Sequence, residues 1–198
     1  ARSFWWASIF FDQDTFQKVA KLYHLCRFVD DCADRLDPRE GRIVLEEVRR
    51  DLLDPSRNSP FQKKFCEIEN YGVKRKDFLE LLNGVESDLS LRELNSEAEF
   101  FMYCYRVAGV VGLMMLPLIG VKDKHASTYA VHLGIGMQMT NICRDVLEDA
   151  NNDRIYLSKE LREIFGVSKQ DFKRTENTPR RLQFLIKSRL ELAEEYYQ

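Results

Sequence analysis

The first residues able to do chemistry lie on a stripe that is otherwise apolar. Steps of three or four residues connect, in order, Phe16, Val19, Tyr23, Cys26, Asp30 and Asp34. Residues at this spacing share one helix face, so two carboxylates one turn apart end a stripe that should face the core. Such acids repel each other and are costly to bury unpaired. If they are buried, they need a cation. If the helix end leaves the core, the acids are solvated instead, and this motif alone does not decide between the two.

A second polar stripe occurs later in the chain. Gln138, Asn141, Asp145 and Asp149 follow one another at steps of three, four and four residues. One flank of this row holds Met139, Ile142, Val146 and Ala150, and the other holds Leu133, Met137, Thr140 and Leu147. A polar row between apolar flanks predicts side chains aimed into a cavity within a helical bundle. Oxygen ligands one turn apart suit Mg²⁺, which takes one or two carboxylates, water and phosphate oxygens; the alternative is a polar network between helices.

A third acid and several cations fit the same chemistry. Asp88 continues the apolar stripe formed by Phe78, Leu81 and Val85. Arg27 precedes Asp30 and Asp31 by one turn, and Arg144, Arg154 and Tyr156 lie near the second acidic group. Arginine forks bind phosphate oxygens, and a metal can bridge carboxylate to phosphate. Together these residues predict a site for a diphosphate.

Helices must position these residues, because apolar spacing along nearly the whole chain has helical periodicity. Segments separated by Pro, Gly and capping residues are expected to be helical over about 14–36, 39–53, 60–70, 74–88, 96–117, 123–150 and 158–165, with a last helix from Thr178 and Pro179. Ser96 and Glu99 form a capping-box pattern. The sequence predicts no strand and no repeat, and therefore a single all-α domain over residues 1–198.

Composition excludes several classes of protein. The 198 residues are 44% hydrophobic and 31% charged, with 30 Lys+Arg against 32 Asp+Glu, which is unlike a disordered chain and excludes a nucleic-acid binder that depends on bulk positive charge. No apolar run approaches the ~20 residues that span a bilayer, and no signal peptide is recognised. The 5 cysteines lack metal-site spacing, so we expect reduced thiols in a cytosolic setting.

Four stretches resemble the squalene/phytoene synthase family. Residues 23–34 (YHLCRFVDDCAD) resemble its first aspartate-rich motif, and residues 138–149 (QMTNICRDVLED) with 153–157 (DRIYL) resemble its second. Residues 103–112 (YCYRVAGVVG) match a third family stretch, and Ser3 and Phe4 resemble the start of its core. All motifs occur in family order, across essentially the whole chain.

The resemblance implies a helical bundle of the terpenoid-synthase (isoprenoid synthase) type around a central cavity. It also implies that further C-terminal helices follow in the family, beyond Gln198. The implied activity is the head-to-head condensation of two C15 or C20 prenyl diphosphates, through a cyclopropylcarbinyl diphosphate, to a linear C30 or C40 hydrocarbon. The cofactor would be Mg²⁺, with Mn²⁺ as a substitute. NADPH would be needed only for a squalene-type product, and a phytoene-type product is favoured.

The resemblance also assigns roles. The metal ligands would be Asp30, Asp34, Asn141, Asp145 and Asp149, of which the four aspartates are also the catalytic acids. Diphosphate would be held by Arg27, Gln138, Arg154 and Tyr156, with further substrate contacts from Ser3, Phe4, Tyr23 and Asp88. Tyr105 would lie near the developing carbocation. The small residues Ala108, Gly109 and Gly112 indicate either close helix packing or room for a prenyl chain.

Two other functions were weighed, and the expected product suggests where in the cell the protein acts. The protein could instead be a non-catalytic relative that acts as a helical assembly or binding protein, although such a protein would have no reason to keep buried acids. A chain-elongating prenyltransferase is disfavoured, because its second motif would read DDxxD. A hydrocarbon product escapes poorly into water, so we expect a cytoplasmic protein with peripheral membrane contact; its oligomeric state stays open.

Overall fold

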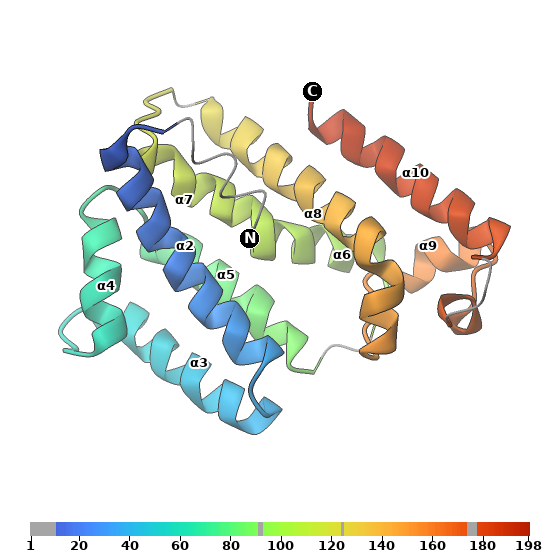
Figure 1. Cartoon of the computed structure of the whole chain (residues 1–198), viewed down its shortest axis with the longest axis horizontal. Helices are drawn as coiled ribbons and strands as arrows, with labels where there is room; N and C mark the ends of the chain where they lie inside the picture. The colour runs from blue at the N-terminus through green and yellow to red at the C-terminus, as the bar shows by residue number, and fades with distance from the viewer. Residues whose placement is uncertain (1–10, 91–92, 124, 174–177) are drawn as a thin grey trace.

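The computed structural model describes residues 11–90, 93–123, 125–173 and 178–198, and this part of the chain is helical (Figure 1). Its elements are α2 (Gln13–Asp34), α3 (Pro38–Leu53), α4 (Pro60–Glu69), α5 (Arg75–Asp88), α6 (Glu97–Cys104), the π-helical turn η1 (Tyr105–Gly109), α7 (Val110–Leu118), α8 (Ala126–Asn151), α9 (Lys159–Ile164), the 3₁₀ turn η2 (Lys169–Phe172) and α10 (Arg180–Tyr196). The β pairing seen within the described residues is a single bridge between Glu93 and Ile155. The predicted all-α fold is confirmed.

Side-chain caps set most helix starts at the predicted places. Asp12, Asp37, Ser59, Ser96 and Ser158 each accept a hydrogen bond from a backbone N–H of the first turn, which satisfies a donor that the helix itself leaves unpaired.

Most helix boundaries lie within two residues of the sequence expectation, and local structure explains the differences at three of them. The helix containing Pro117 continues to Leu118, because a proline so close to the C-terminal end costs only a local backbone bond. The long helix α8 begins at Ala126, since the Asp123 side chain accepts from the backbone N–H of His125 instead of capping the helix. Pro179 is the N-cap of α10 and not its first helical residue.

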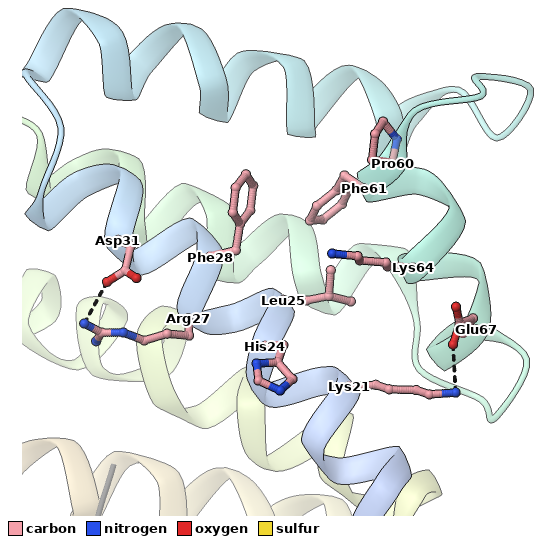
Figure 2. Close-up of a pocket in the computed structure, with 10 residues that line it drawn as sticks. All are labelled: Lys21, His24, Leu25, Arg27, Phe28, Asp31, Pro60, Phe61, Lys64 and Glu67. Atoms are coloured by element: carbon pink, nitrogen blue, oxygen red, sulfur yellow. Dashed lines mark ion pairs between the residues drawn. The ribbon is translucent and has the colours of Figure 1, made fainter.

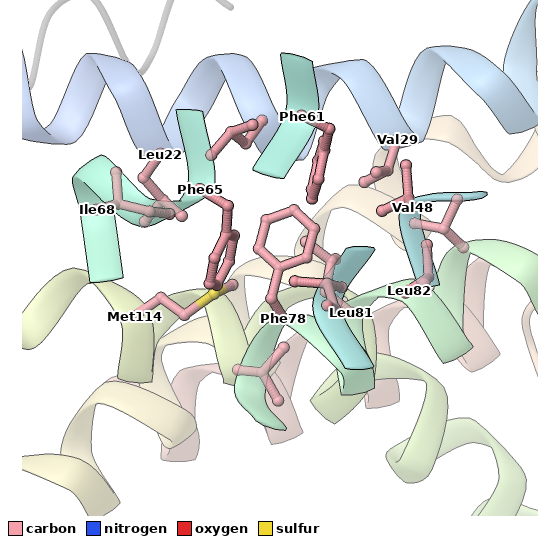
Figure 3. Packing of buried hydrophobic residues seen from close by; sticks show 14 of the residues in the cluster. Leu22, Val29, Val48, Phe61, Phe65, Ile68, Phe78, Leu81, Leu82 and Met114 are labelled. Atoms are coloured by element: carbon pink, nitrogen blue, oxygen red, sulfur yellow. The ribbon is translucent and has the colours of Figure 1, made fainter. Parts of the chain in front are cut away.

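One hydrophobic core joins α2, α3, α4, α5 and α7 (Figure 3). Its centre is a set of mutually packed rings, with Phe61 and Phe65 each in contact with Phe78 at centroid distances of 5.7 and 5.4 Å. The helix α2 contributes Val19, Leu22, Leu25 and Val29 to this core. Phe16, which the apolar stripe placed inside, is 40% exposed. Phe16, Asp30 and Asp34 therefore lie at the edge of this core, although Val19 of the same stripe is fully buried.

A second core joins α6, α8, α9, η2 and α10. It contains Phe100, Met139, Leu157, Leu182 and Leu185, all fully or almost fully buried. Only one predicted flank of the polar row on α8 is covered within the described residues, because Leu133 and Met137 are 51% and 50% exposed. The helix α10 instead covers a neighbouring face of α8, where Cys143 and Gly136 lie. All five cysteines are free.

Glycines allow α7 and η1 to lie directly against α8. A Cβ on Gly112 would overlap the backbone carbonyl of Ala130, and a Cβ on Gly134 would overlap that of Ala108. Gly109 is similarly enclosed, because a Cβ there would lie 3.1 Å from the Tyr105 ring and 3.4 Å from Val131. Of the two interpretations of these small residues, the structure supports close helix packing.

The segments α6, η1 and α7 form one continuous helix, Glu97–Leu118, that is long and apolar enough to cross a membrane, with a mean hydropathy of 1.5. The sequence analysis did not predict this helix as a candidate span, because charged residues interrupt its apolar residues. These charges connect it to neighbouring helices, since Arg106 pairs with Glu80 at 3.1 Å and Glu97 pairs with the buried Arg189 at 2.6 Å. Its packing against α5 and α8 is that of a bundle helix.

We predict that Gly112→Ala destabilises the protein. In an open helix this change stabilises by about 0.5–1 kcal/mol, whereas here the added methyl meets the Ala130 carbonyl and overpacking costs about 1–3 kcal/mol. Urea denaturation followed by circular dichroism measures the free energy of unfolding. Ala98→Val, at an exposed position of α6, should change it by less than about 0.5 kcal/mol. An unchanged or raised urea midpoint for Gly112→Ala would contradict the close contact between α7 and α8.

Candidate functional site

The acidic stripes meet in one cavity of about 250 Å³ between the two cores. Its polar lining consists of Asp30, Asp34, Asp88, Tyr103, Gln138, Asn141, Asp145, Asp149, Arg154 and Tyr156, and its apolar walls are Ala33, Val85, Val107 and Ile142. The carboxylates of α2 thus face those of α8 across a shared space, as their helical spacing predicts. Asp88, at the last position of α5, joins them.

Three helix C-termini concentrate negative potential at this cavity. The helices α2, α5 and α8 end at Asp34, Asp88 and Asn151, and none of them has a basic residue in its last turn. The C-terminal end of a helix carries a partial negative charge, which basic side chains usually offset. Here acids occupy the place of those bases, so the site attracts cations strongly.

Burial and neighbouring carboxylates raise the pKa values of two carboxyls in this cavity, whereas a third is lowered by an arginine. Burial, with a further contribution from Asp34, raises the pKa of Asp30 to about 7. Burial, reinforced by Asp145, raises the pKa of Asp149 to about 6. Asp145 itself has a lowered pKa, because the exposed Arg144 side chain donates hydrogen bonds of 2.7 and 2.6 Å to its two oxygens. Without a further cation, Asp30 is therefore only partly ionised at neutral pH, and Asp149 takes up a proton slightly below it.

Two tyrosine hydroxyls hold Asp88. Tyr156 donates to one carboxylate oxygen at 3.0 Å and Tyr103 donates to the other at 3.1 Å. The two rings stack with centroids 4.8 Å apart. Burial raises the pKa of Asp88 to about 6, although the Tyr156 hydrogen bond opposes this shift. The sequence analysis gave Tyr103 no role. Its position within an apolar helix could have indicated one, because a buried tyrosine hydroxyl needs a hydrogen-bond partner.

The loop after α8 carries Arg154 and Tyr156 to the cavity. It turns at Asp153, which has a positive φ of 59°, and is then fixed by a backbone bond of 3.2 Å from Leu94 to Ile155. In this extended segment, residues two apart point to the same side, so Arg154 and Tyr156 both line the cavity. The Arg154 guanidinium lies 3.2 Å from Asp34 and is the one cationic side chain among the lining residues.

Several predicted site residues lie elsewhere. Arg27 forms an ion pair of 2.7 Å with Asp31, in a groove between α2 and α4 (Figure 2). Tyr23 is half-buried but does not line the acidic cavity. Tyr105 lines a separate cavity of about 590 Å³. Ser3 and Phe4 lie outside the described residues. For Arg27, Tyr23 and Tyr105, the direction in which the side chain leaves its helix decides which cavity it reaches. Membership of a sequence motif does not give that direction.

The groove beside Arg27 is larger than the acidic cavity, at about 750 Å³, but most of its charged side chains are paired with one another. Figure 2 shows Lys21 paired with Glu67 and Arg27 paired with Asp31 along its rim. These pairs neutralise most of its charge, and its floor is formed by Phe28 and Phe61. Catalytic chemistry is therefore better placed in the smaller cavity, where unneutralised acids converge.

The acidic cavity suits cations that keep part of their hydration. Within the described residues, no group of three or more His, Cys, Asp or Glu side chains is close enough to cage one ion. Mg²⁺ does not need such a cage, since it usually binds one or two carboxylates together with water and substrate phosphate. Asp30, Asp34, Asn141, Asp145 and Asp149 offer suitable oxygens on opposite walls.

Comparisons with known proteins agree with this geometry. The family model for squalene/phytoene synthase matches residues 1–198. The presqualene diphosphate synthase of Sinorhizobium fredii is 34% identical over 164 residues, which cover 78% of this chain and 57% of that protein. The phytoene synthase of Thermus thermophilus is 34% identical over 181 residues, which cover 89% of this chain and 62% of that protein. The chain thus spans about six tenths of the length of these curated relatives.

Solved structures show the same architecture. A dehydrosqualene synthase crystallised with a ligand matches 100% of this chain and 70% of its own, with a TM-score of 0.90 at 33% identity. A squalene synthase from Alicyclobacillus acidocaldarius, at 21% identity and a TM-score of 0.83 over 100% of this chain and 77% of its own, supports the fold alone. The fold is that of the isoprenoid synthases. From the match over its full length and from these relatives, the chain belongs to the squalene/phytoene synthase family.

Proposed function

We propose that the protein joins two prenyl diphosphates head to head, with the acidic cavity as the site where a diphosphate leaves. The balanced first step converts two prenyl diphosphates to a cyclopropylcarbinyl diphosphate, one diphosphate and one proton. The observation that carries this proposal is the convergence of five aspartates and one arginine in a single cavity. A leaving diphosphate with bound divalent cations is the partner that this excess of carboxylates fits.

The cavity fits Mg²⁺ by charge and by donor type. Burial, together with neighbouring carboxylates, raises the pKa values of Asp30 and Asp149 in spite of Arg27 and Arg154. The donors are carboxylate and amide oxygens, which hard cations prefer. Asp30 and Asp34 would hold the ion on one wall, and Asn141, Asp145 and Asp149 would hold it on the other. Mg²⁺ bound there would offset the charge of the departing diphosphate.

The chain's own residues supply orientation and water exclusion. Arg154, held by Asp34 at 3.2 Å, is placed to donate to a diphosphate oxygen. Asp88 keeps a fixed orientation because both its oxygens accept tyrosine hydrogen bonds. Val85, Val107 and Ile142 form walls without hydrogen-bonding groups, which keeps water from a carbocation formed beside them.

The proposal also concerns which class of product is formed. Presqualene diphosphate synthases and phytoene synthases are equally similar to this chain, and the step common to both is the one proposed above. We favour a phytoene-type product, formed without reductant. The test is incubation with farnesyl or geranylgeranyl diphosphate and Mg²⁺, with and without NADPH, followed by mass spectrometry of the products. Formation of no C30 or C40 product from either substrate would refute the proposal.

A non-catalytic helical binding protein is the second candidate, but no observation favours it. Such a protein could replace the buried acids by apolar side chains, which would remove the energetic cost of burying charge. The retained carboxylates with raised pKa values are costly without a ligand.

We predict that Asp145→Asn lowers turnover at least a hundredfold while the protein stays folded. The substitution removes a carboxylate from the wall formed by α8 and weakens cation binding. Steady-state assays with Mg²⁺ measure turnover, and circular dichroism checks the fold. Asp153→Asn is the matched control, because Asp153 is exposed, does not line the cavity, and has a positive φ that Asn tolerates. Equal turnover of Asp145→Asn and wild type would exclude cation-assisted ionisation at this cavity.

We also predict that the metal-free protein becomes more stable as the pH falls from 8 to 5.5. Folding raises the pKa of Asp30 to about 7 and that of Asp149 to about 6, so the folded state binds protons that the unfolded state has released. Their protonation stabilises the folded state, and this contribution is lost as pH rises through 6–7. Melting temperatures in EDTA should therefore increase by a few degrees on acidification.

The same experiment has two controls. Mg²⁺ added at pH 8 should raise the melting temperature by binding the ionised carboxylates, and Asp30→Asn should flatten the pH dependence, whereas Asp153→Asn should not. A metal-free melting temperature that falls steadily from pH 8 to 5.5 would show that folding does not raise the pKa values of Asp30 and Asp149.

A further inference from the structure

The loop that carries Arg154 and Tyr156 to the acidic cavity is held by the segment that precedes α6. The backbone N–H of Leu94 donates to the carbonyl of Ile155 at 3.2 Å, and the backbone N–H of Lys159 donates to the carbonyl of Leu94 at 2.8 Å. These two bonds fix the backbone before and after Tyr156. The course of the loop therefore depends on where the segment before α6 lies.

Glu97, the first residue of α6, joins the end of this loop to two other elements. One oxygen of its carboxylate accepts a hydrogen bond from the hydroxyl of Ser158, and the other accepts one of 2.6 Å from the guanidinium of Arg189 on α10. Its backbone N–H donates to the side chain of Glu160 on α9 at 2.9 Å. The first turns of α6 and α9 are thus connected to the middle of α10 through one residue (Figure 1).

Ser158 has one orientation that satisfies both of its neighbours. It is fully buried and is the N-cap of α9, where its side-chain oxygen accepts from the backbone N–H of Leu161 at 3.1 Å. The hydroxyl proton is then free to be donated to Glu97. Ser158 follows Tyr156 by two residues, which is about 7 Å of extended chain. A shift of Ser158 is therefore passed to the Tyr156 hydroxyl and its hydrogen bond to Asp88.

Arg189 lies in the second core, where a charged side chain is costly. It is 2% exposed, and its guanidinium lies 4.2 Å from the centroid of the Phe100 ring. Its Nε and Nη1 atoms have no hydrogen-bond partner among the described residues. A buried ion pair adds little stability, and apolar side chains of similar size in its place are often neutral or stabilising. The position that Arg189 gives to Glu97 explains this pair better than a gain in stability does.

We propose that Glu97 is a positioning residue for the loop that binds diphosphate. Arg189 fixes the Glu97 carboxylate, and Glu97 in turn fixes Ser158. Ser158 then holds the loop in the course that brings Arg154 and Tyr156 to the cavity. Glu97, Ser158 and Arg189 do not line the cavity themselves, so they act through the loop. This inference rests on the proposed function, in which Arg154 donates to a diphosphate oxygen.

The test measures the binding of inorganic diphosphate in the presence of Mg²⁺ by isothermal titration calorimetry. Ser158→Ala removes the hydroxyl that donates to Glu97. Glu97→Met/Arg189→Met removes the buried ion pair with little change in side-chain volume. In both variants we expect the dissociation constant for diphosphate to rise about fivefold or more, because Arg154 loses the position from which it makes a charge-assisted hydrogen bond.

Ser59→Ala is the matched control. Ser59 is also the N-cap of a helix, α4, and its hydroxyl also donates to a carboxylate on another helix, that of Asp51 on α3. It does not line the acidic cavity. Both serine variants should lower the melting temperature, because each loses a helix cap, but Ser59→Ala should bind diphosphate like wild type.

The double methionine variant separates positioning from stability. Its melting temperature should lie within about 5 °C of wild type or above it, because the substitution leaves no unpaired charge in the core. A purely structural role for the ion pair would leave the diphosphate affinity of this folded variant unchanged. The variant also keeps the inference testable if Ser158→Ala does not fold.

The outcomes distinguish this inference from the proposed function. Unchanged diphosphate binding in either folded variant, an equal loss in Ser59→Ala, or no diphosphate binding by wild type would overturn the inference. Product formation from prenyl diphosphates is assayed separately. If wild type forms no C30 or C40 product while the expected differences in diphosphate binding are seen, the proposed function is wrong and the positioning role stands. If wild type forms product and the variants bind diphosphate equally well, the positioning role alone is wrong.

Discussion

The burial of several carboxylates in one cavity is the constraint on which the rest of the structure depends. Five aspartates line about 250 Å³ together with one arginine, at the C-terminal ends of three helices. The fold must hold these carboxylates together before any cation arrives, and their raised pKa values show that this is energetically unfavourable. On the proposed function, a bound cation would recover that free energy, because it would bind the folded protein and not the unfolded chain.

The two hydrophobic cores make this arrangement tolerable. One core joins α2 to α5 and α7, and the other surrounds the C-terminal half of α8, so neither needs the acidic cavity for its own packing. The carboxylates occupy the seam between them, where Asp30 can lie at the edge of one core and Asp149 beside the other. Phe61, Phe65 and Phe78 pack against one another inside the first core (Figure 3), and none of them lines the acidic cavity. Apolar burial on both sides thus stabilises a polar centre.

The sequence predicted the helices and the facing acids well, because both depend on local rules. Caps such as Asp37 and Ser96 act within one turn, and residues at steps of three and four must share a helix face. What it could not predict depends on helix phase in three dimensions. Arg27 pairs with Asp31 four residues later, and only packing decides that this pair lies in the groove between α2 and α4 and not in the acidic cavity. Tyr103 lies two residues before Tyr105, yet the two rings reach different cavities.

The helix α8 separates these two environments along its own length. Asp145 lines the acidic cavity and Ser127 lines the cavity of about 590 Å³ that contains Tyr105. The two residues are 18 positions apart, which corresponds to about 27 Å at a rise of 1.5 Å per residue. The lining of the first cavity is mostly acidic, whereas the second combines apolar side chains of α7 and α8 with Lys74, Lys76 and Asp77. On the proposed function, a diphosphate would bind at the acidic cavity and the carbocation would form beside it, where the diphosphate leaves. The length of α8 keeps the carboxylates away from the second cavity, so an apolar chain lying there would not meet them.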